Sequence, residues 1–206
     1  VKELGDRTAG LEDKMVAYEE AQNSMAEKLD SLTERMEAQE GKTADLEDRG
    51  RRNNLRIRGI AENIGPTELT AYLVGLFKAL APDVPPDMFL MDRAHRVPKP
   101  TFLPPETPRD VLLRMHYFHI KEEVMRANRT RKKTDMPAAY QAIAIYADIS
   151  AYTLRRRKEF AGITTQLRQQ QIPYRWGYPV KLIVQRNGRP TTIQNPDEGM
   201  KILRTW

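Results

Sequence analysis

The sequence predicts an α+β protein in which a long N-terminal coiled coil precedes two small α/β domains. Residues 4–50 carry an unbroken heptad repeat, which is typical of a coiled coil. Residues 54–128 follow the order strand, helix, strand, strand, helix, and a second, shorter α/β pattern begins at residue 142. We therefore expect a coiled-coil oligomerisation domain over 1–50, an α/β domain over 51–135 and a C-terminal domain over 136–206.

The heptad repeat also indicates how the N-terminal helices pair. Its seam positions recur at alternating steps of four and three, with d at Leu4 and a at Thr8. All charged g residues are basic and all charged e residues are acidic, so a parallel, in-register pairing brings opposite charges together. An antiparallel pairing would oppose like charges. The predicted seam consists of Leu4, Thr8, Leu11, Met15, Tyr18, Gln22, Met25, Leu29, Leu32, Met36, Gln39, Thr43 and Leu46.

The number of chains in the coiled coil is predicted from a short segment near its end. Residues 35–40 resemble a trimerisation signature in which Arg35 and Glu40 flank two apolar positions, although Gln39 stands where the second apolar residue is expected. The sequence thus favours a homotrimer over a homodimer. The expected oligomerisation residues are Leu4, Leu11, Met15, Tyr18, Met25, Leu29, Leu32, Arg35, Met36, Glu40 and Leu46.

Charge divides sharply along the chain. Residues 1–50 hold seven basic and fourteen acidic side chains, a net charge of −7, whereas residues 51–206 hold 27 basic and fourteen acidic ones, a net charge of +13. A basic globular part attached to an acidic rod indicates a polyanionic partner for the globular part. Nucleic acid is favoured over an anionic membrane surface, because the sequence has no basic amphipathic helix or lipidation motif.

Composition argues against catalysis. The chain has no cysteine, which excludes disulfides, thiolate metal sites and a cysteine nucleophile. Its three histidines lack a cluster of partner ligands, and no glycine-rich segment matches a nucleotide-binding loop. We find no signal peptide and no apolar stretch of membrane-spanning length. We therefore expect a soluble, intracellular protein that is not an enzyme and holds no metal or cofactor.

The first α/β domain is predicted from five elements and one loop. The elements are a strand over 54–60, a helix over 66–80, strands over 88–97 and 109–115, and a helix over 118–128. Residues 98–108 contain five prolines and must form an extended loop. This order is that of a ferredoxin-like split βαβ fold, the architecture of RNA-recognition (RRM-like) domains, and also of many small domains with no such function.

A basic hinge over residues 129–134 leads to the second domain. The predicted elements are a strand over 142–147, a helix over 151–170, strands over 174–176, 180–185 and 191–194 around an Asn187-Gly188 turn, and a helix from Pro196. On the long helix, Leu154, Phe160, Ile163 and Leu167 should face the core. About 70 residues give this domain a limited core.

Basic and aromatic residues mark the expected binding surface. Arginines and lysines cluster at 51–56, 93–96, 129–133 and 155–158. The last cluster is predicted at a helix start, where the helix dipole disfavours cations and an anion would relieve the cost. Tyr174, Trp176 and Tyr178 alternate with Arg175 near Lys181, a mixture that suits bases and phosphates, although Tyr174 and Trp176 are equally suited to core packing.

The first strand offers Arg56 and Arg58 where RNA-recognition domains place stacking rings. We therefore expect recognition mainly through phosphates, with little sequence specificity.

Six short motifs make the whole chain resemble the first-open-reading-frame protein of LINE-type (long interspersed element) retrotransposons. They are Arg52-Asn53-Asn54-Leu55-Arg56, Gly59-Ile60-Ala61-Glu62, Arg93-Ala94-His95-Arg96, Thr107-Pro108-Arg109-Asp110, Ala147-Asp148-Ile149-Ser150 and Tyr178-Pro179-Val180-Lys181-Leu182. The order of coiled coil, RRM-like domain and C-terminal domain is the same.

This resemblance implies a homotrimer that binds the single-stranded RNA of its own element, acts as a nucleic-acid chaperone and packages that RNA into ribonucleoprotein for retrotransposition. It implies cytoplasmic ribonucleoprotein particles, and leaves open a nuclear location and single-stranded DNA as a second ligand. The alternative function is a coiled-coil scaffold whose basic heads bind an acidic protein or a membrane surface.

The resemblance and the basic clusters together define the expected nucleic-acid contacts. These are Arg52, Asn54, Arg56, Arg93, Arg96, Arg109, Arg129, Arg131, Lys132, Arg156, Arg157, Lys158, Tyr178 and Lys181. Lys158 stands where the family usually has an arginine, so a bidentate contact is not expected there. We expect the two α/β domains to form a basic cleft that a hinge over 129–137 opens and closes.

Overall fold

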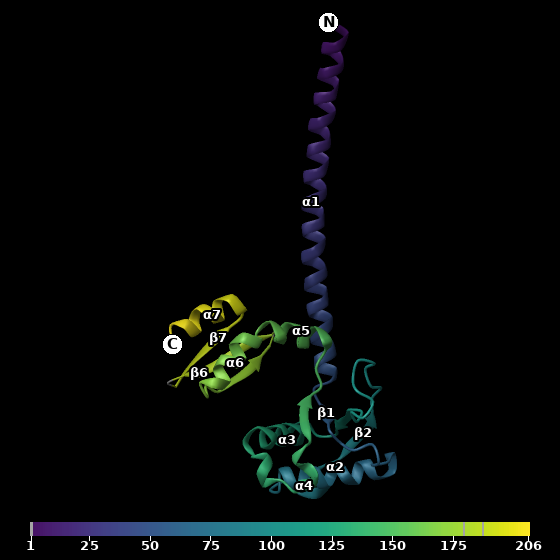
Figure 1. The fold of residues 1–206 in the computed structure, drawn as a ribbon, viewed down its shortest axis with the longest axis vertical. Coiled ribbons are helices and arrows are strands. Elements are labelled where there is room, and N and C mark those ends of the chain that lie inside the picture. The colour runs from purple at the N-terminus through teal and green to yellow at the C-terminus, as the bar shows by residue number, and fades with distance from the viewer. Residues whose placement is uncertain (1, 179, 187) are drawn as a thin grey trace. The chain divides into compact units, whose positions relative to one another are not determined.

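A computed structural model describes residues 2–178, 180–186 and 188–206, and it describes side chains from residue 10 onward except those of residues 12 and 13. The seam position Leu4 and the turn residue Asn187 therefore lie outside the described side chains. Packing divides the chain into two compact units, Val1–Ala44 and Asp45–Trp206. The structure is of the predicted mixed α+β class, with a long N-terminal helix and two antiparallel sheets (Figure 1).

The N-terminal helix α1 runs from Lys2 to Gly50 without interruption, as the heptad repeat predicts. The large apolar seam side chains that are described, from Leu11 to Leu46, are between 53% and 70% exposed in the single chain. A stripe of exposed leucine and methionine along one helix is unfavourable in water unless another surface covers it.

The first sheet contains β1 (Asn54–Arg58), β2 (Met91–Arg96), β3 (Val111–Met115) and β4 (Ala144–Ala147) in the order β2-β3-β1-β4, and every pairing is antiparallel. Helices α2 (Pro66–Leu80) and α3 (Phe118–Thr130) pack on one face of it. Leu55 and Ile57 alternate along β1 with polar residues and are fully buried against Phe77 and Val124 in that core. The opposite face carries the polar partners of this alternation.

The prediction that the strand over 142–147 belongs to the second domain was wrong. β4 pairs with β1, with Ile145 opposite Ile57, and both isoleucines are buried in the first core. Without β4, strand β1 would be the last strand of the sheet and one of its edges would be left unpaired. The first sheet therefore extends to Ala147 rather than ending before residue 136.

The segment predicted as a hinge is folded onto the first domain. It forms the 3-10 helix η2 (Lys133–Asp135) and the short helix α4 (Ala138–Gln141). Met136 is buried in the first core, and Tyr140 packs edge-to-face on Tyr72 of α2 with ring centres 5.4 Å apart. These contacts oppose the free movement that a hinge over 129–137 would require.

The second sheet contains β5 (Tyr174–Gly177), β6 (Lys181–Arg186) and β7 (Arg189–Ile193) as an antiparallel meander. The same domain contains helices α5 (Ala151–Glu159), α6 (Ala161–Gln169) and α7 (Pro196–Arg204). Phe160, Leu167 and Leu182 lie in its core. Gly188 has a φ of 75°, the left-handed conformation that glycine favours in a tight turn.

The single helix predicted over 151–170 is instead two helices that meet at Phe160. Leu154 was predicted to face the core together with Phe160, but its side chain is exposed and Thr153 is buried in its place. Because the helix is interrupted at Phe160, residues before and after it need not share one face.

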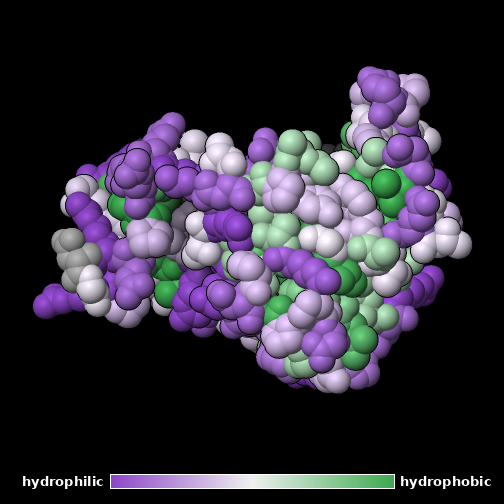
Figure 2. Space-filling model, turned by 90° about the horizontal axis from the view of Figure 1, so that it is seen from below, coloured by the Kyte–Doolittle hydropathy of each residue, from purple (hydrophilic) through white to green (hydrophobic). Residues whose placement is uncertain are grey.

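The surface agrees with the hydrophilic composition. Hydrophilic side chains are spread over the face drawn in Figure 2, and strongly hydrophobic ones form small, separate groups there. Within the described ranges, no helix combines the length and apolarity that crossing a lipid bilayer requires. The described residues also contain no group of three or more acidic or histidine side chains placed to hold a metal ion.

Candidate nucleic-acid interface

The face of the first sheet that α2 and α3 leave uncovered is lined with arginines. The β1 alternation that buries Leu55 and Ile57 turns Arg56 and Arg58 to this open face. In register, Arg93 of β2 lies opposite Arg114 of β3. Tyr146 of β4, opposite Arg56, is 48% exposed and its ring lies 5.7 Å from the Arg58 guanidinium. This open face, with Arg56, Arg58, Arg93, Arg114 and Tyr146, therefore offers four cations and one ring.

Asp148 organises one side of the open face. Its carboxylate is buried and accepts hydrogen bonds from Asn54 Nδ2 at 3.2 Å, Arg56 Nη2 at 3.3 Å and Arg51 Nη1 at 3.5 Å. A buried carboxylate with three donors is well compensated, and removing it would leave the donors unpaired. The Ala147-Asp148-Ile149-Ser150 motif thus has a structural role in positioning Arg56.

Asp110 performs the same task at the other end of β1. It accepts from Arg58 Nε at 3.2 Å and from Arg56 Nη1 at 3.5 Å, so Arg56 spans two carboxylates. The hydrogen bond and charge of Asp110 raise the pKa of the Arg58 guanidinium. Both arginine side chains remain partly exposed, which leaves part of each guanidinium available to an anionic ligand.

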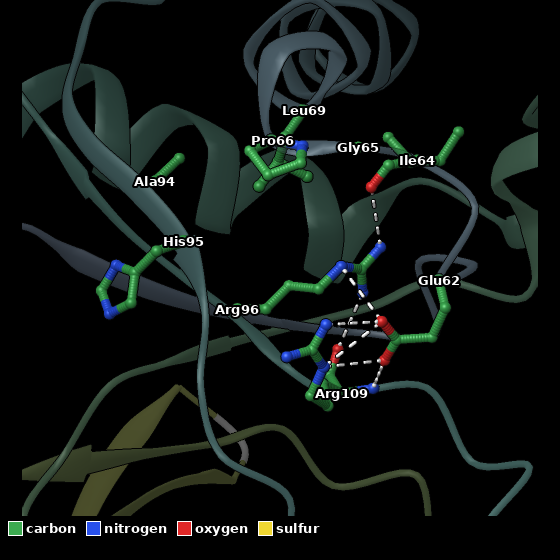
Figure 3. A pocket seen from close by; sticks show the side chains of 9 residues that line it. All are labelled: Glu62, Ile64, Gly65, Pro66, Leu69, Ala94, His95, Arg96 and Arg109. Atoms are coloured by element: carbon green, nitrogen blue, oxygen red, sulfur yellow. Dashed lines mark hydrogen bonds and ion pairs between the residues drawn. The ribbon is translucent and has the colours of Figure 1, made fainter.

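The Arg96 side chain is nearly buried and stabilises a loop, although it was predicted to lie on the binding surface. Its side chain is only 9% exposed, and it donates hydrogen bonds to the backbone carbonyls of Ile60, Ala61, Ile64 and Arg109. Figure 3 shows its guanidinium directed into a pocket of about 290 Å³ at the start of α2, while His95 points away. Because these carbonyls occupy its donors, Arg96 holds the 60–64 loop and is poorly placed to bind a phosphate.

Arg109 is exposed but already paired. Glu62 accepts from the Arg109 backbone N–H at 2.6 Å and from its Nη2 at 3.0 Å (Figure 3). The Arg109 side-chain and backbone hydrogen bonds lower the pKa of Glu62 to about 2. A phosphate that binds Arg109 must therefore share the guanidinium with this carboxylate.

Acid titration tests the Glu62–Arg109 pair. Because the folded-state pKa of Glu62 is lowered, its pair stabilises the fold fully above about pH 4.5, and this stabilisation is lost as the pH falls toward about 2. We expect Glu62→Gln to lose less unfolding free energy than the wild type over that window, by less than about 1 kcal/mol because the pair is solvent-screened. Thermal unfolding followed by circular dichroism at steps of pH measures this, and identical pH profiles would contradict it.

The basic cluster of the predicted hinge is divided between two roles. Arg131 donates from Nη1 to the carbonyl of Leu80 at 3.1 Å, which caps the C-terminal end of α2. Arg129 and Lys132 are exposed and remain candidates for phosphate contacts. Arg52 is also exposed, and its guanidinium lies 5.9 Å from the ring centre of Phe118.

The basic cluster at 155–158, in the second α/β domain, lies at the end of a helix and not at the predicted helix start. Because α5 stops at Glu159, residues Arg156, Arg157 and Lys158 occupy its last turn, where the helix dipole favours cations. The argument that an anion relieves an unfavourable dipole there was therefore wrong. Arg156 pairs with Glu159 at 3.0 Å, and Lys158 is exposed.

Arg157 is the unusual member of this cluster. Its guanidinium lies 4.9 Å from the ring centre of Trp176, and its Nε is buried with no hydrogen-bond partner. Burial lowers its pKa, and the charge of Asp48 acts in the opposite direction. Trp176 in turn packs edge-to-face on the buried Phe160. Arg157 is thus a desolvated cation in a fixed orientation, with a donor that remains to be satisfied.

The aromatic residues near β5 separate into packed and exposed ones. Tyr174 packs on the second core and its hydroxyl accepts from Arg168 Nε at 3.1 Å, so Tyr174 and Trp176 both have structural roles. Tyr178 is 64% exposed, and the Arg49 guanidinium lies 5.9 Å from its ring. Lys181 is partly exposed at the start of β6. Tyr178 is therefore the ring in this group that is available to a base.

Three residues of the open face are absent from the expected contacts, although the sequence analysis noted Arg58 on the first strand. Arg58 and Arg114 follow the two-residue period of strands whose alternate residues are buried, and that period was the signal for them. Tyr146 was missed because its strand was assigned to the other domain. The structure brings Asn54, Arg56 and Arg93 together on this face, and it separates Arg96 and Arg131 from it.

The comparisons with known proteins extend over the whole chain, although no protein-family model matches it. The chain is similar to the LINE-1 retrotransposable element ORF1 protein of Mus musculus, with 22% identity over 213 residues, which covers 100% of this chain and 56% of that protein. It is also 24% identical over 160 residues to the LINE-1 type transposase domain-containing protein 1 of Mus musculus, covering 77% of this chain and 20% of that protein. The chain thus spans about half the length of the first relative and a fifth of the second. The resemblance predicted from its motifs is confirmed.

Proposed function

We propose that this LINE ORF1-like chain is a trimeric, single-stranded RNA-binding protein and nucleic-acid chaperone that packages retrotransposon RNA into ribonucleoprotein. The observation that carries the proposal is the open arginine face in a chain similar over its full length to a LINE-1 ORF1 protein. It acts as a binding protein, not as an enzyme. Cytoplasmic ribonucleoprotein particles are its proposed location, and single-stranded DNA is a second ligand of the same chemistry.

The RRM-like interpretation rests on topology. The strand order β2-β3-β1-β4, with two helices on one face and an open second face, is the arrangement in which RNA-recognition domains bind bases on the sheet. Here the central strands carry Arg56, Arg58 and Arg114 in place of stacking rings. Phosphate contacts should therefore dominate, and sequence preference should be weak.

The trimer accounts for the exposed seam of α1. A parallel coiled coil would cover the leucine and methionine side chains that lie in solvent in the single chain. It would also place three binding units on one stalk. Each contact with RNA would be weak by itself, but tethering raises the local concentration of the other binding units for the same RNA. Weak, exchangeable contacts let strands move to better-paired states without ATP, which is chaperone activity.

Anisotropy titration of a labelled single-stranded RNA at two salt concentrations tests this function. We expect tight binding that weakens steeply with salt, since each neutralised phosphate releases counterions, and that survives an excess of duplex DNA. Equal displacement by duplex DNA would reduce the function to general polyanion binding. No binding at low salt would overturn the proposal in favour of a scaffold with an acidic protein or membrane partner.

A further inference from the structure

The proline loop, residues 98–108, displays one large apolar side chain to solvent. Phe102 is 82% exposed, more than any other described large hydrophobic residue. It lies outside the open arginine face described above. Neither the charge of the chain nor packing against other residues explains why this ring is exposed. An exposed phenylalanine loses the stabilisation that burial would give it.

The proline loop is internally braced. The Lys99 ammonium donates to the carbonyls of Pro104 at 3.0 Å, Pro105 at 2.7 Å and Thr107 at 3.2 Å. The backbone N–H of Leu103 donates to the carbonyl of Pro100 at 3.2 Å, which closes a turn around Phe102. The five prolines fix φ at their positions. Phe102 is thus held on a pre-organised turn, so a ligand would meet little additional cost of ordering the loop.

The ends of the proline loop join it to the arginine face. The loop connects β2 to β3, and the Val97 N–H donates to the carbonyl of Asp110 at 2.9 Å. The carboxylate of the same Asp110 holds Arg58 on the open face. Arg109, which stands next to Asp110, is bound to Glu62. Phe102 therefore lies on a loop whose C-terminal end adjoins two partly exposed arginines, Arg58 and Arg109.

We propose that Phe102 is a base-stacking residue, on which an unpaired nucleobase of a bound single strand stacks while its phosphates reach the neighbouring arginines. This inference rests on the proposed function and deepens it. Among residues 98–108, Phe102 is the one large hydrophobic side chain that is exposed, which falls short of the contiguous apolar patch that a protein or membrane partner needs. Every base has a face that stacks on an aromatic ring, so the contact adds affinity without sequence preference.

Substitutions at Phe102 in the full chain test the proposal by anisotropy with a single-stranded RNA 20-mer. We expect Phe102→Ala and Phe102→Leu each to weaken binding about fivefold or more, with an unchanged salt slope, and Phe102→Tyr to bind as the wild type does. Leu90→Ala is the matched control, because it removes an exposed side chain at the opposite end of β2. It should leave affinity unchanged.

A fluorescence titration provides an independent readout. Phe102→Trp adds an exposed indole to Trp176 and Trp206, and its extra emission over the wild type should be quenched by the RNA. Wild-type affinity in Phe102→Ala, or unquenched emission in Phe102→Trp, would overturn the stacking role alone. If Phe102→Ala lost binding to phosphatidylserine vesicles while its RNA affinity stayed unchanged, the stacking role would be overturned in favour of a membrane contact. Failure of the wild type itself to bind RNA would overturn the proposed function as well.

Discussion

Replacement of both Leu29 and Leu32 by aspartate should convert the proposed trimer into single chains and weaken RNA binding by about a hundredfold or more. Both leucines belong to the heptad seam and are more than half exposed in the single chain. In a coiled coil they would be buried, and a carboxylate at the same position would lose its hydration without gaining a partner. A single chain has one binding unit, so it loses the gain in affinity that tethering provides.

Sedimentation equilibrium measures the first effect. The wild type should have three times the 23.8 kDa mass of one chain, and the doubly substituted chain should have that mass once. The control carries Ser24→Asp and Ser31→Asp, which add the same two charges on α1 away from the seam. It should remain a trimer with wild-type RNA affinity. An oligomer that persists in the seam variant, or RNA affinity that does not change when it dissociates, would contradict the role given to the rod.

Most of the fold was predicted from the sequence because most helices and strands are specified by short local patterns. The heptad, the alternation of Leu55 and Ile57 with arginines, and the Pro66 helix start all depend on neighbouring residues. The position of β4 depends instead on an edge of β1 about 90 residues away, which no local pattern specifies. The break at Phe160 was also missed: Gly162 lies two residues beyond it but inside the next helix, and the Phe160 ring at the break is fully buried.

The site was predicted less completely because a sequence does not distinguish a free arginine from one engaged with backbone carbonyls. Arg96 and Arg131 have the composition of binding residues, yet both donate to carbonyls of loops or helix ends distant in sequence. Arg109 is exposed and still paired with Glu62. Arg56 keeps its predicted place because Asp110 and Asp148, which orient it, leave part of its side chain exposed.

Arg157→Ala should weaken RNA binding by roughly tenfold to a hundredfold, because a charge-assisted hydrogen bond contributes about 1.5–3 kcal/mol. The Arg157 guanidinium is oriented by Trp176 and has a buried Nε without a partner. The side chain as a whole is partly exposed, so a phosphate oxygen would accept from the exposed part of the guanidinium, and the partial desolvation already present would strengthen that contact. If one phosphate is lost, the slope of log affinity against log salt should become shallower by about 0.7 for a single strand.

Two further substitutions separate this role from general charge. Arg157→Lys keeps the charge but not the planar fork or the stack on Trp176, so its affinity should fall between those of the wild type and Arg157→Ala. Arg155→Ala removes the same charge from an exposed position of α5 and should have the smallest effect. All three variants should keep the wild-type oligomer mass, because neither Arg155 nor Arg157 is a seam residue. Equal losses in Arg155→Ala and Arg157→Ala would assign the effect to net charge, and dissociation of the oligomer by Arg157→Ala would show that its role is structural.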